Sequence, residues 1–200
     1  ESKIEVIYNW VDEKAVVPNK KADNTLYEEL GISRDKFNVV YAGNFGHAQN
    51  IEVILKAAER LQSHTDIRFL LFGTGGLKEK FMEVAHNMNL DNVDFYPLQP
   101  YDKVSNVYSL ADIGIVSCKK GIGKGAMPSK TWSILSASRP VLANFDENEL
   151  KTIVTENQCG IFTKAGDKED FRQAILGLYH DRARCEQLGR NGREFILKNL

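Results

Sequence analysis

The feature of this sequence that most restricts its fold is a regular alternation of short apolar runs with amphipathic segments. The apolar runs are typical of strands buried on both faces of a sheet, and the segments between them repeat their apolar residues at helical spacing. We predict strands at residues 37–42, 67–72, 93–96, 112–116, 140–143 and 160–162, with a further apolar run at 4–7. We predict helices at residues 26–30, 51–62, 77–88, 104–109, 129–137, 147–156, 168–179 and 182–197.

This order of elements predicts an α/β domain with a doubly wound, Rossmann-like parallel sheet covered by helices on both faces. The chain has 200 residues, which suits one such domain. We expect residues 1–36 to lead into the domain and residues 37–200 to form it. The polar stretch at residues 19–24 is interpreted as a surface loop. Because the sequence begins with Glu1 and not with Met, we expect a fragment of a longer protein.

Charge and cysteine usage exclude several classes of protein. The 26 basic residues are balanced by 27 acidic ones, which argues against a general nucleic-acid binder. No apolar run approaches the roughly 18 residues of a membrane helix, and no secretory signal is visible. The cysteines are far apart and have no metal-ligand spacing, so we expect reduced thiols in a cytoplasmic protein and no metal site. They are Cys118, Cys159 and Cys185.

Four segments lie where a ligand of such a sheet would bind. Ligands of open parallel sheets sit beyond the carboxyl ends of the strands. The segments that follow predicted strands, and that are rich in glycine, proline or polar residues, are 43–49, 73–76, 98–101 and 118–130. The first is neither a GxGxxG nor a P-loop sequence, and each of the first three can equally be an ordinary turn.

The fourth segment is the most informative. Residues 119–130 contain four lysines and no acid, and Pro128-Ser129-Lys130 then opens a predicted helix, with Ser129 as its cap. A lysine and a hydroxyl at a helix start suit a pyrophosphate. A solvated basic loop is the alternative, whereas a nucleic-acid contact is disfavoured because no aromatic residues alternate with the lysines. The acids that follow strand 140–143 are interpreted as the first turn of the next helix: Asp146, Glu147 and Glu149.

Together these segments resemble the C-terminal, donor-binding domain of retaining glycosyltransferases of the two-Rossmann-domain (GT-B) type, glycosyltransferase family four. The resemblance runs over nearly the whole chain, in residues 4–12, 41–50, 72–75, 110–116, 136–143, 157–160 and 188–193. Gly43-Asn44-Phe45-Gly46 and Pro128-Ser129-Lys130 are most similar to the subgroup of colanic-acid and L-fucosamine transferases. The chain would then be one half of a GT-B fold.

The resemblance implies a nucleotide-diphosphate sugar as donor, a UDP-sugar before a GDP-sugar, and no cofactor. The sugar would pass with retention to a saccharide or lipid-linked acceptor in surface-polysaccharide synthesis. The acceptor would bind an N-terminal domain absent from this chain, so the chain alone would bind nucleotide and transfer nothing. A cytoplasmic location follows, with peripheral attachment at the inner face of the membrane as an alternative for the full-length enzyme.

The sequence departs from the family at positions that usually contact the donor. Two glutamates around the donor helix are replaced by Gly125 and Ser133, and an Arg and a Lys of the first glycine loop by Asn44 and Gln49. We therefore predict that Lys130 and Ser129 are catalytic, stabilising the leaving diphosphate. The predicted donor-binding residues are Gly43, Asn44, Phe45, Gly46, His47, Gly73, Thr74, Leu98, Gln99, Lys124, Met127, Pro128 and Ser133.

Two alternatives remain open from the sequence. A sugar-nucleotide epimerase of the same fold would need acid and base residues in the cleft, for which His47 alone is a weak basis. A non-catalytic nucleotide-binding or interaction domain would keep the fold without the chemistry.

Overall fold

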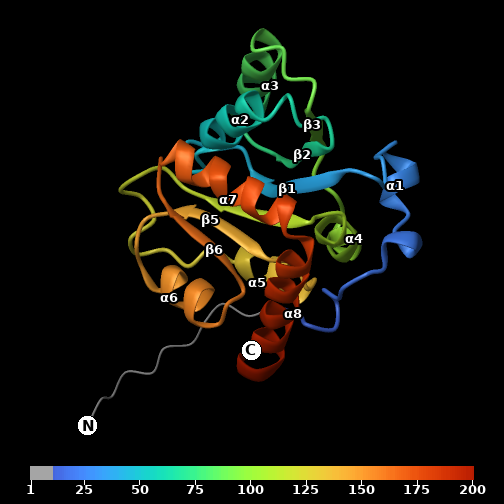
Figure 1. The fold of residues 1–200 in the computed structure, drawn as a ribbon, viewed down its shortest axis with the longest axis vertical. Coiled ribbons are helices and arrows are strands. Elements are labelled where there is room, and N and C mark those ends of the chain that lie inside the picture. The colour runs from blue at the N-terminus through green and yellow to red at the C-terminus, as the bar shows by residue number, and fades with distance from the viewer. Residues whose placement is uncertain (1–10) are drawn as a thin grey trace.

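The computed structural model describes residues 11–200, which form a single parallel sheet between two layers of helices (Figure 1). The predicted run at residues 4–7 lies outside the described residues. The six strands lie in the order β3-β2-β1-β4-β5-β6, and every neighbouring pair is parallel. This confirms the predicted doubly wound, Rossmann-like sheet. The strands are β1 (Phe37–Asn44), β2 (Ile67–Thr74), β3 (Val93–Tyr96), β4 (Ile113–Ser117), β5 (Val141–Phe145) and β6 (Gly160–Lys164).

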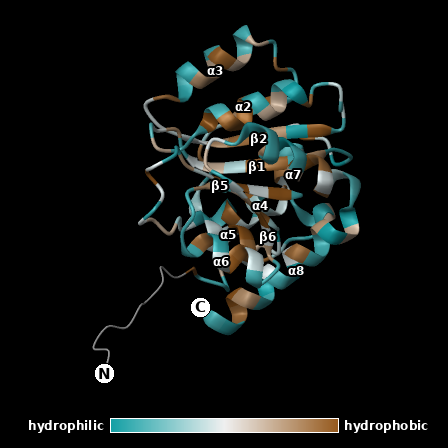
Figure 2. Ribbon diagram, turned by 60° about the vertical axis from the view of Figure 1, so that its left-hand side comes forward, coloured by the Kyte–Doolittle hydropathy of each residue, from teal (hydrophilic) through white to brown (hydrophobic). Residues whose placement is uncertain are grey.

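The helices follow the predicted amphipathic segments, most of them within about three residues at either end. Their apolar stripes turn toward the sheet and their polar faces turn outward (Figure 2). Short 3-10 turns, η1 (Lys21–Asp23) and η2 (Tyr101–Lys103), precede two of them. The α-helices are α1 (Leu26–Glu29), α2 (Ile51–Arg60), α3 (Lys78–Asn87), α4 (Val104–Ser109), α5 (Lys130–Ser136), α6 (Glu149–Glu156), α7 (Lys168–His180) and α8 (Arg182–Asn199).

The two faces of the sheet are covered by different helices because successive strand residues point to opposite sides. In β1, Val39 and Tyr41 pack with α2, α3 and α7, whereas Val40 packs with α1 and α4. On that second face, β4 and β5 pack against α5 and α6. All of these strand residues are fully buried, so each face has its own core and the strands lack a polar side.

The strand order reverses between β1 and β4. From β1 the chain adds β2 and β3 on one side, and from β4 it adds β5 and β6 on the other. The two strands pair over a short register, Val39 with Ile113 and Val40 with Gly114. A crevice at the carboxyl ends of these strands is the usual ligand position of a doubly wound sheet.

The interpretation of residues 19–24 as a surface loop is wrong in part. The segment contains η1, and Asn24 is fully buried. The Asn24 side chain donates to the Asn106 carbonyl oxygen at 2.8 Å and accepts from the Leu26 amide at 3.1 Å. The Asn24 side chain satisfies backbone groups of two helices, and this is why a polar residue is buried here. A prediction based on polarity alone places such a residue at the surface.

The chain before α1 is bound to the end of α8. Val16 is buried beside α5 and α8, and its carbonyl oxygen accepts from Ser136 Oγ at 2.6 Å and from Arg193 Nη1 at 3.2 Å. Arg193 Nη2 also donates to the Glu13 carbonyl oxygen at 2.9 Å. These contacts join residues 177 and 180 positions apart in the sequence.

Helix α8 approaches the chain closely at Gly189. A Cβ atom at this position would lie 2.3 Å from the carbonyl oxygen of Ser138, in the turn after α5. Only glycine therefore lets α8 lie this close to the turn.

Among the described residues, no helix is long and apolar enough to span a bilayer.

Candidate functional site

A cavity of about 390 Å³ opens at the carboxyl end of β1, where the strand order reverses. Its wall is built from the end of β1, the segment after β3, helix α4 and the start of α5. Seven of the predicted site residues line it: Gly43, Asn44, Leu98, Gln99, Ser129, Lys130 and Ser133. Six of these residues come from three of the four segments selected from the sequence, and Ser133 lies in the helix that follows the last one; the structure brings them together around one space.

Lys130, at the first position of α5, reaches under the turn that ends β1. A Cβ atom placed on Gly43 would lie 2.6 Å from Lys130 Nζ, and the ammonium sits 4.0 Å from the centre of the Tyr41 ring. Gly43 has a positive φ of 153°. Glycine is required there both for this backbone conformation and for the close approach of the ammonium.

The surroundings of Lys130 make its ammonium easier to deprotonate than usual. Burial lowers its pKa from 10.5 to about 8, because desolvation disfavours the charged form. Among the hydrogen bonds and ion pairs of the described residues, none involves Lys130 Nζ, and the Tyr41 ring is its one recorded partner. A half-buried cation without a carboxylate partner can compensate the charge of an anionic ligand.

The Tyr41 hydroxyl holds the turn itself. It donates to the Asn44 carbonyl oxygen at 2.6 Å, and burial raises its pKa, so the phenol stays protonated. The ring therefore serves as a fixed floor under Lys130.

The Phe45 side chain does not face the cavity, because it is fully buried in the core. Its ring packs against Tyr41 at 5.7 Å, Phe95 at 5.9 Å and Phe81 at 6.4 Å. In a turn that leaves a buried strand, one side chain returns to the core, and here it is the aromatic one.

The second glycine segment supports the first and does not line the cavity. A Cβ atom on Gly73 would lie 1.8 Å from the Gly43 carbonyl oxygen, and one on Gly75 would lie 2.4 Å from Asn44 Oδ1. The Thr74 carbonyl oxygen accepts from the Phe45 amide at 2.8 Å. These glycines let the ends of β1 and β2 pack together. For residues 73–76 the structure therefore favours a turn required by packing over a segment that lines the cavity.

The remaining predicted residues also lie outside the cavity wall. His47 and Lys124 are exposed, and Met127 packs against the core of the α5 face. Gly46 and Pro128 are likewise absent from the lining. The Ser129 side chain makes no capping hydrogen bond, because its backbone is already helical (φ −57°, ψ −29°), so the predicted N-cap bond is wrong.

Sequence reasoning missed half of the wall. The unpredicted lining residues are Ala42, Gln49, Phe72, Tyr101, Val104, Val107 and Tyr108. Val104, Val107 and Tyr108 recur at helical spacing in α4, a signal that was present but is normally assigned to the core. Leu98 and Tyr101 are 59% and 66% exposed, which gives one end of the cavity an apolar rim.

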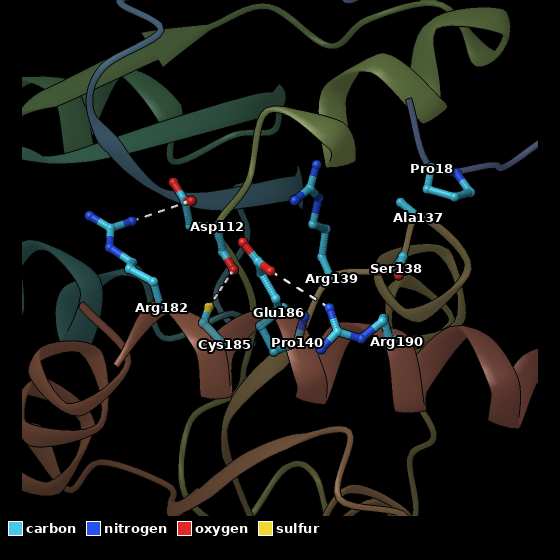
Figure 3. A pocket seen from close by; sticks show the side chains of 10 residues that line it. All are labelled: Pro18, Asp112, Ala137, Ser138, Arg139, Pro140, Arg182, Cys185, Glu186 and Arg190. Atoms are coloured by element: carbon cyan, nitrogen blue, oxygen red, sulfur yellow. Dashed lines mark hydrogen bonds and ion pairs between the residues drawn. The ribbon is translucent and has the colours of Figure 1, made fainter. Parts of the chain in front are cut away.

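A second cavity, of about 310 Å³, lies at the amino ends of β4 and β5 against α8 (Figure 3). Arg182 pairs with Asp112 at 3.4 Å, and Arg190 pairs with Glu186 at 3.6 Å. Burial raises the pKa of Asp112. These charges face one another across the wall, at the edge of the sheet opposite to Lys130, so we assign them to the packing of α8.

Metal and thiol chemistry find little support among residues 11–200. No group of three or more His, Cys, Asp or Glu side chains there could hold a metal ion. The three cysteines are free and buried. Burial raises the pKa of all three thiols, to about 12 for Cys159 and Cys185, so they are not thiolates at neutral pH.

A doubly wound sheet with a lysine-bearing cavity at its point of reversal defines a Rossmann-like class of domain, in which ligands bind at that point. The chain belongs to the family "Glycosyl transferases group 1", whose sequence model matches residues 23–195. It is 33% identical to the putative colanic acid biosynthesis glycosyl transferase WcaI of Escherichia coli strain K12 over 113 residues, which are 56% of this chain and 28% of that protein. The chain spans half or less of the length of the curated relatives it matches.

Solved structures of glycosyltransferases share the fold. The Anabaena protein HepE in complex with UDP-glucose superposes with a TM-score of 0.82 at 14% identity, over 97% of this chain and 52% of that one. The C-terminal domain of the group 1 glycosyl transferase LpcC from Francisella tularensis gives a TM-score of 0.76 at 14% identity, over 94% of this chain and 97% of that one. The sheet is therefore that of one half of a GT-B glycosyltransferase.

Proposed function

We propose that the chain is the donor-binding domain of a glycosyltransferase and that its cavity holds the diphosphate of a UDP-sugar beside Lys130. The observation that carries the proposal is the Lys130 ammonium, which is desolvated, close to Gly43 and without a carboxylate partner among the described residues. A diphosphate supplies the negative charge that this position lacks.

The proposed role of Lys130 in the reaction is to stabilise the leaving diphosphate. As the bond between the sugar C1 and the β-phosphate oxygen breaks, its electron pair stays on that oxygen and the diphosphate gains negative charge. An ammonium fixed by Tyr41 and Gly43 meets this charge without reorganising. Ser129 and Ser133 add hydroxyl donors at the same wall.

The apolar rim supports a role in binding the base. Leu98 and Tyr101 expose large apolar surfaces beside the polar wall, and a uracil ring has one flat apolar face and polar edges that a neighbouring amide such as Gln99 can contact. HepE and the Staphylococcus aureus protein TarM, which share the fold, were solved with UDP. This favours UDP over other nucleoside diphosphates.

We further propose that a second domain of the full-length protein binds the acceptor. The similarity to the C-terminal domain of LpcC supports a C-terminal place for this chain, and the name of WcaI supports a role in surface-polysaccharide synthesis. Transfer would proceed with retention to a saccharide or lipid-linked acceptor, in the cytoplasm or at the inner face of the membrane. Catalytic groups on the acceptor side would belong to that second domain.

The cavity gives no support to an epimerase. Its lining contains no histidine, aspartate, glutamate or cysteine among the described residues, so the carboxylates and histidines expected of an epimerase are not found there. Product analysis with the full-length protein separates the two: free UDP with a new glycoside indicates a transferase, and an epimerised UDP-sugar indicates an epimerase.

Calorimetric titration with UDP, GDP and ADP tests the proposed donor site. We expect UDP to bind more tightly than the other two, and uridine, which lacks the diphosphate, to bind about tenfold or more weaker than UDP. If none of the three nucleotides binds, the chain is better described as an interaction domain. Equal affinity for uridine and UDP would contradict the diphosphate site.

The affinity for UDP should depend on pH through Lys130. UDP prefers the protonated ammonium, whose pKa in the free protein is about 8. Affinity should therefore be nearly constant between about pH 6.5 and 7, where the UDP diphosphate is mostly ionised, and fall as the pH rises above 8, because binding must then also take up a proton. Lys130→Arg, which stays charged, should remove this fall. Calorimetric titrations of both proteins with UDP between pH 6.5 and 9.5 measure this change in affinity. The same pH profile in wild type and Lys130→Arg would contradict the expectation.

A further inference from the structure

The lysine-rich loop between β4 and α5 is held by the carboxylate of Asp146, a residue that the sequence analysis assigned to the first turn of the next helix. Asp146 follows β5 and is only 8% exposed. Its carboxylate accepts from the Gly121 amide at 2.7 and 3.0 Å and from the Gly123 amide at 2.8 Å. The prediction that Asp146 and Glu147 belong to the first turn of α6 is therefore wrong, because the helix begins at Glu149, the third predicted acid, which does lie in that turn.

The two glycines are needed for this arrangement. Gly121 has a φ of +91°, in the region that favours glycine. A Cβ atom on Gly123 would lie 2.6 Å from Cys118 Sγ and 2.6 Å from the Phe145 ring. The glycines let the loop backbone turn its amides onto Asp146 at close range.

Asn148 holds the next part of the same loop. Its Nδ2 donates to the carbonyl oxygens of Gly123 and Ala126, both at 2.8 Å, while its Oδ1 accepts from the Leu150 amide at 2.9 Å. One side chain thus caps α6 and fixes the loop two residues before Pro128 and four before Lys130.

The start of the loop is fixed to the chain between β1 and α2 and to α2 itself. The Lys119 amide donates to the Ala48 carbonyl oxygen at 2.8 Å, and Lys119 Nζ lies 3.4 Å from Glu52 in α2. The segment that begins beside the β1 turn and ends at Lys130 is therefore restrained at its start, middle and end. The buried carboxylate bonds to backbone amides, and no ion pair of the described residues joins it to a lysine.

We infer that Asp146, assisted by Asn148, is a positioning residue for diphosphate binding: it fixes the backbone of loop 119–128, which leads into α5, and so keeps Lys130 in place at the donor cavity. The inference rests on the proposed function, since it names what orders that site. A fixed loop spares the ligand the entropy of ordering it, so the restraint raises affinity without touching the ligand.

Two variants test this, with a neighbouring acid as control. Asp146→Asn replaces one of the two acceptor oxygens by an NH2 donor and removes the negative charge. Asn148→Asp keeps the α6 cap but cannot donate to the loop carbonyls. Glu147→Gln alters an exposed acid that pairs with Lys151 and Lys164 and has no bond to the loop. Trypsin reports loop opening directly, because it cleaves after Lys119, Lys120 and Lys124.

In the protein without ligand, both loop variants should be cleaved in the loop about tenfold faster than wild type, relative to cleavage elsewhere, and Glu147→Gln should not. Their Kd for UDP should rise by about fivefold or more, and saturating UDP should slow the loop cleavage. A merely structural role would instead speed cleavage at all sites and lower Tm. If Asp146→Asn does not fold, Asn148→Asp carries the test alone.

Three results would overturn the inference, and each can be told from the others. Unchanged loop cleavage in the variants would mean that Asp146 and Asn148 do not restrain the loop. Faster cleavage with an unchanged Kd for UDP would mean that the restraint does not serve binding. Absence of UDP binding by the wild-type protein would contradict the proposed function itself, and the positioning role with it, even where the cleavage rates differ.

Discussion

Replacing Lys130 with methionine is expected to weaken UDP binding by about tenfold or more while making the folded protein more stable at pH 7. The loss of affinity follows from removing the cation that lies beside Gly43 without a carboxylate partner. Methionine fills a similar volume above the Tyr41 ring, so the wall of the cavity should keep its shape.

The gain in stability follows from the lowered pKa of Lys130. An unfolded lysine has a pKa near 10.5 and the folded one about 8, so at pH 7 both states are protonated and folding must desolvate the charge. The unfolded chain binds the proton more tightly, so the wild-type protein gains stability as the pH rises from about 8 to 10.5. The stability difference between Lys130→Met and wild type should shrink over the same range.

We expect roughly 1 kcal/mol at pH 7, discounted because the side chain is only half-buried, which corresponds to about 2–4 °C in Tm for a chain of this size. Thermal unfolding at pH 7 and 9.5 measures it, and calorimetry with UDP measures the affinity. Lys80→Met, at an exposed position of α3 outside the cavity wall, is the matched control. A variant with lower Tm and unchanged affinity would contradict both parts of the expectation.

Alanine at two helical glycines should have opposite effects on stability. Gly177 in α7 is exposed, and a Cβ atom there meets nothing within 4 Å, so Gly177→Ala should stabilise the protein by about 0.5–1 kcal/mol through helix propensity. Gly189 in α8 gains the same propensity, but its Cβ would lie 2.3 Å from the Ser138 carbonyl oxygen. Because that oxygen belongs to the backbone, α8 must shift, and Gly189→Ala should destabilise by about 2–3 kcal/mol net.

Urea unfolding of the two variants beside wild type gives the free energies of unfolding directly. The pair controls for propensity, since both changes add one methyl group to a helix and differ only in what that group meets. Equal effects in the two variants would mean that α8 relaxes away from the turn after α5 without loss of stability.

The fold could be predicted from the sequence because its signal lies in apolar periodicity. Runs such as residues 67–72 are buried on both faces, and α2 repeats its apolar residues on one side. The failures concern polar residues, whose side-chain bonds depend on the local backbone. Asn24 is buried by such bonds, and Ser129 needs no capping bond because its own backbone is already helical.

The candidate site could be predicted only in part. The rule for carboxyl strand ends found Gly43, Leu98 and Lys130 because the topology decides where those segments meet. It could not foresee that the Phe45 side chain is buried, since the rule selects a turn and does not say which side chain of the turn returns to the core. Asp146 was misread because its partners are backbone amides, which leave no pattern in side-chain sequence.

The bonds from Arg193 to Glu13 and Val16 have a consequence for biosynthesis. The stretch around Val16 leaves the ribosome 177 residues before the arginine that bonds to it. Until α8 has been made, Val16 lacks Arg193 and the α8 part of its apolar surroundings, which includes Ile196. The packing around Val16 can therefore be completed only after synthesis has passed Arg193. A nascent chain stalled before this point would expose apolar surface near Val16 that chaperones can bind.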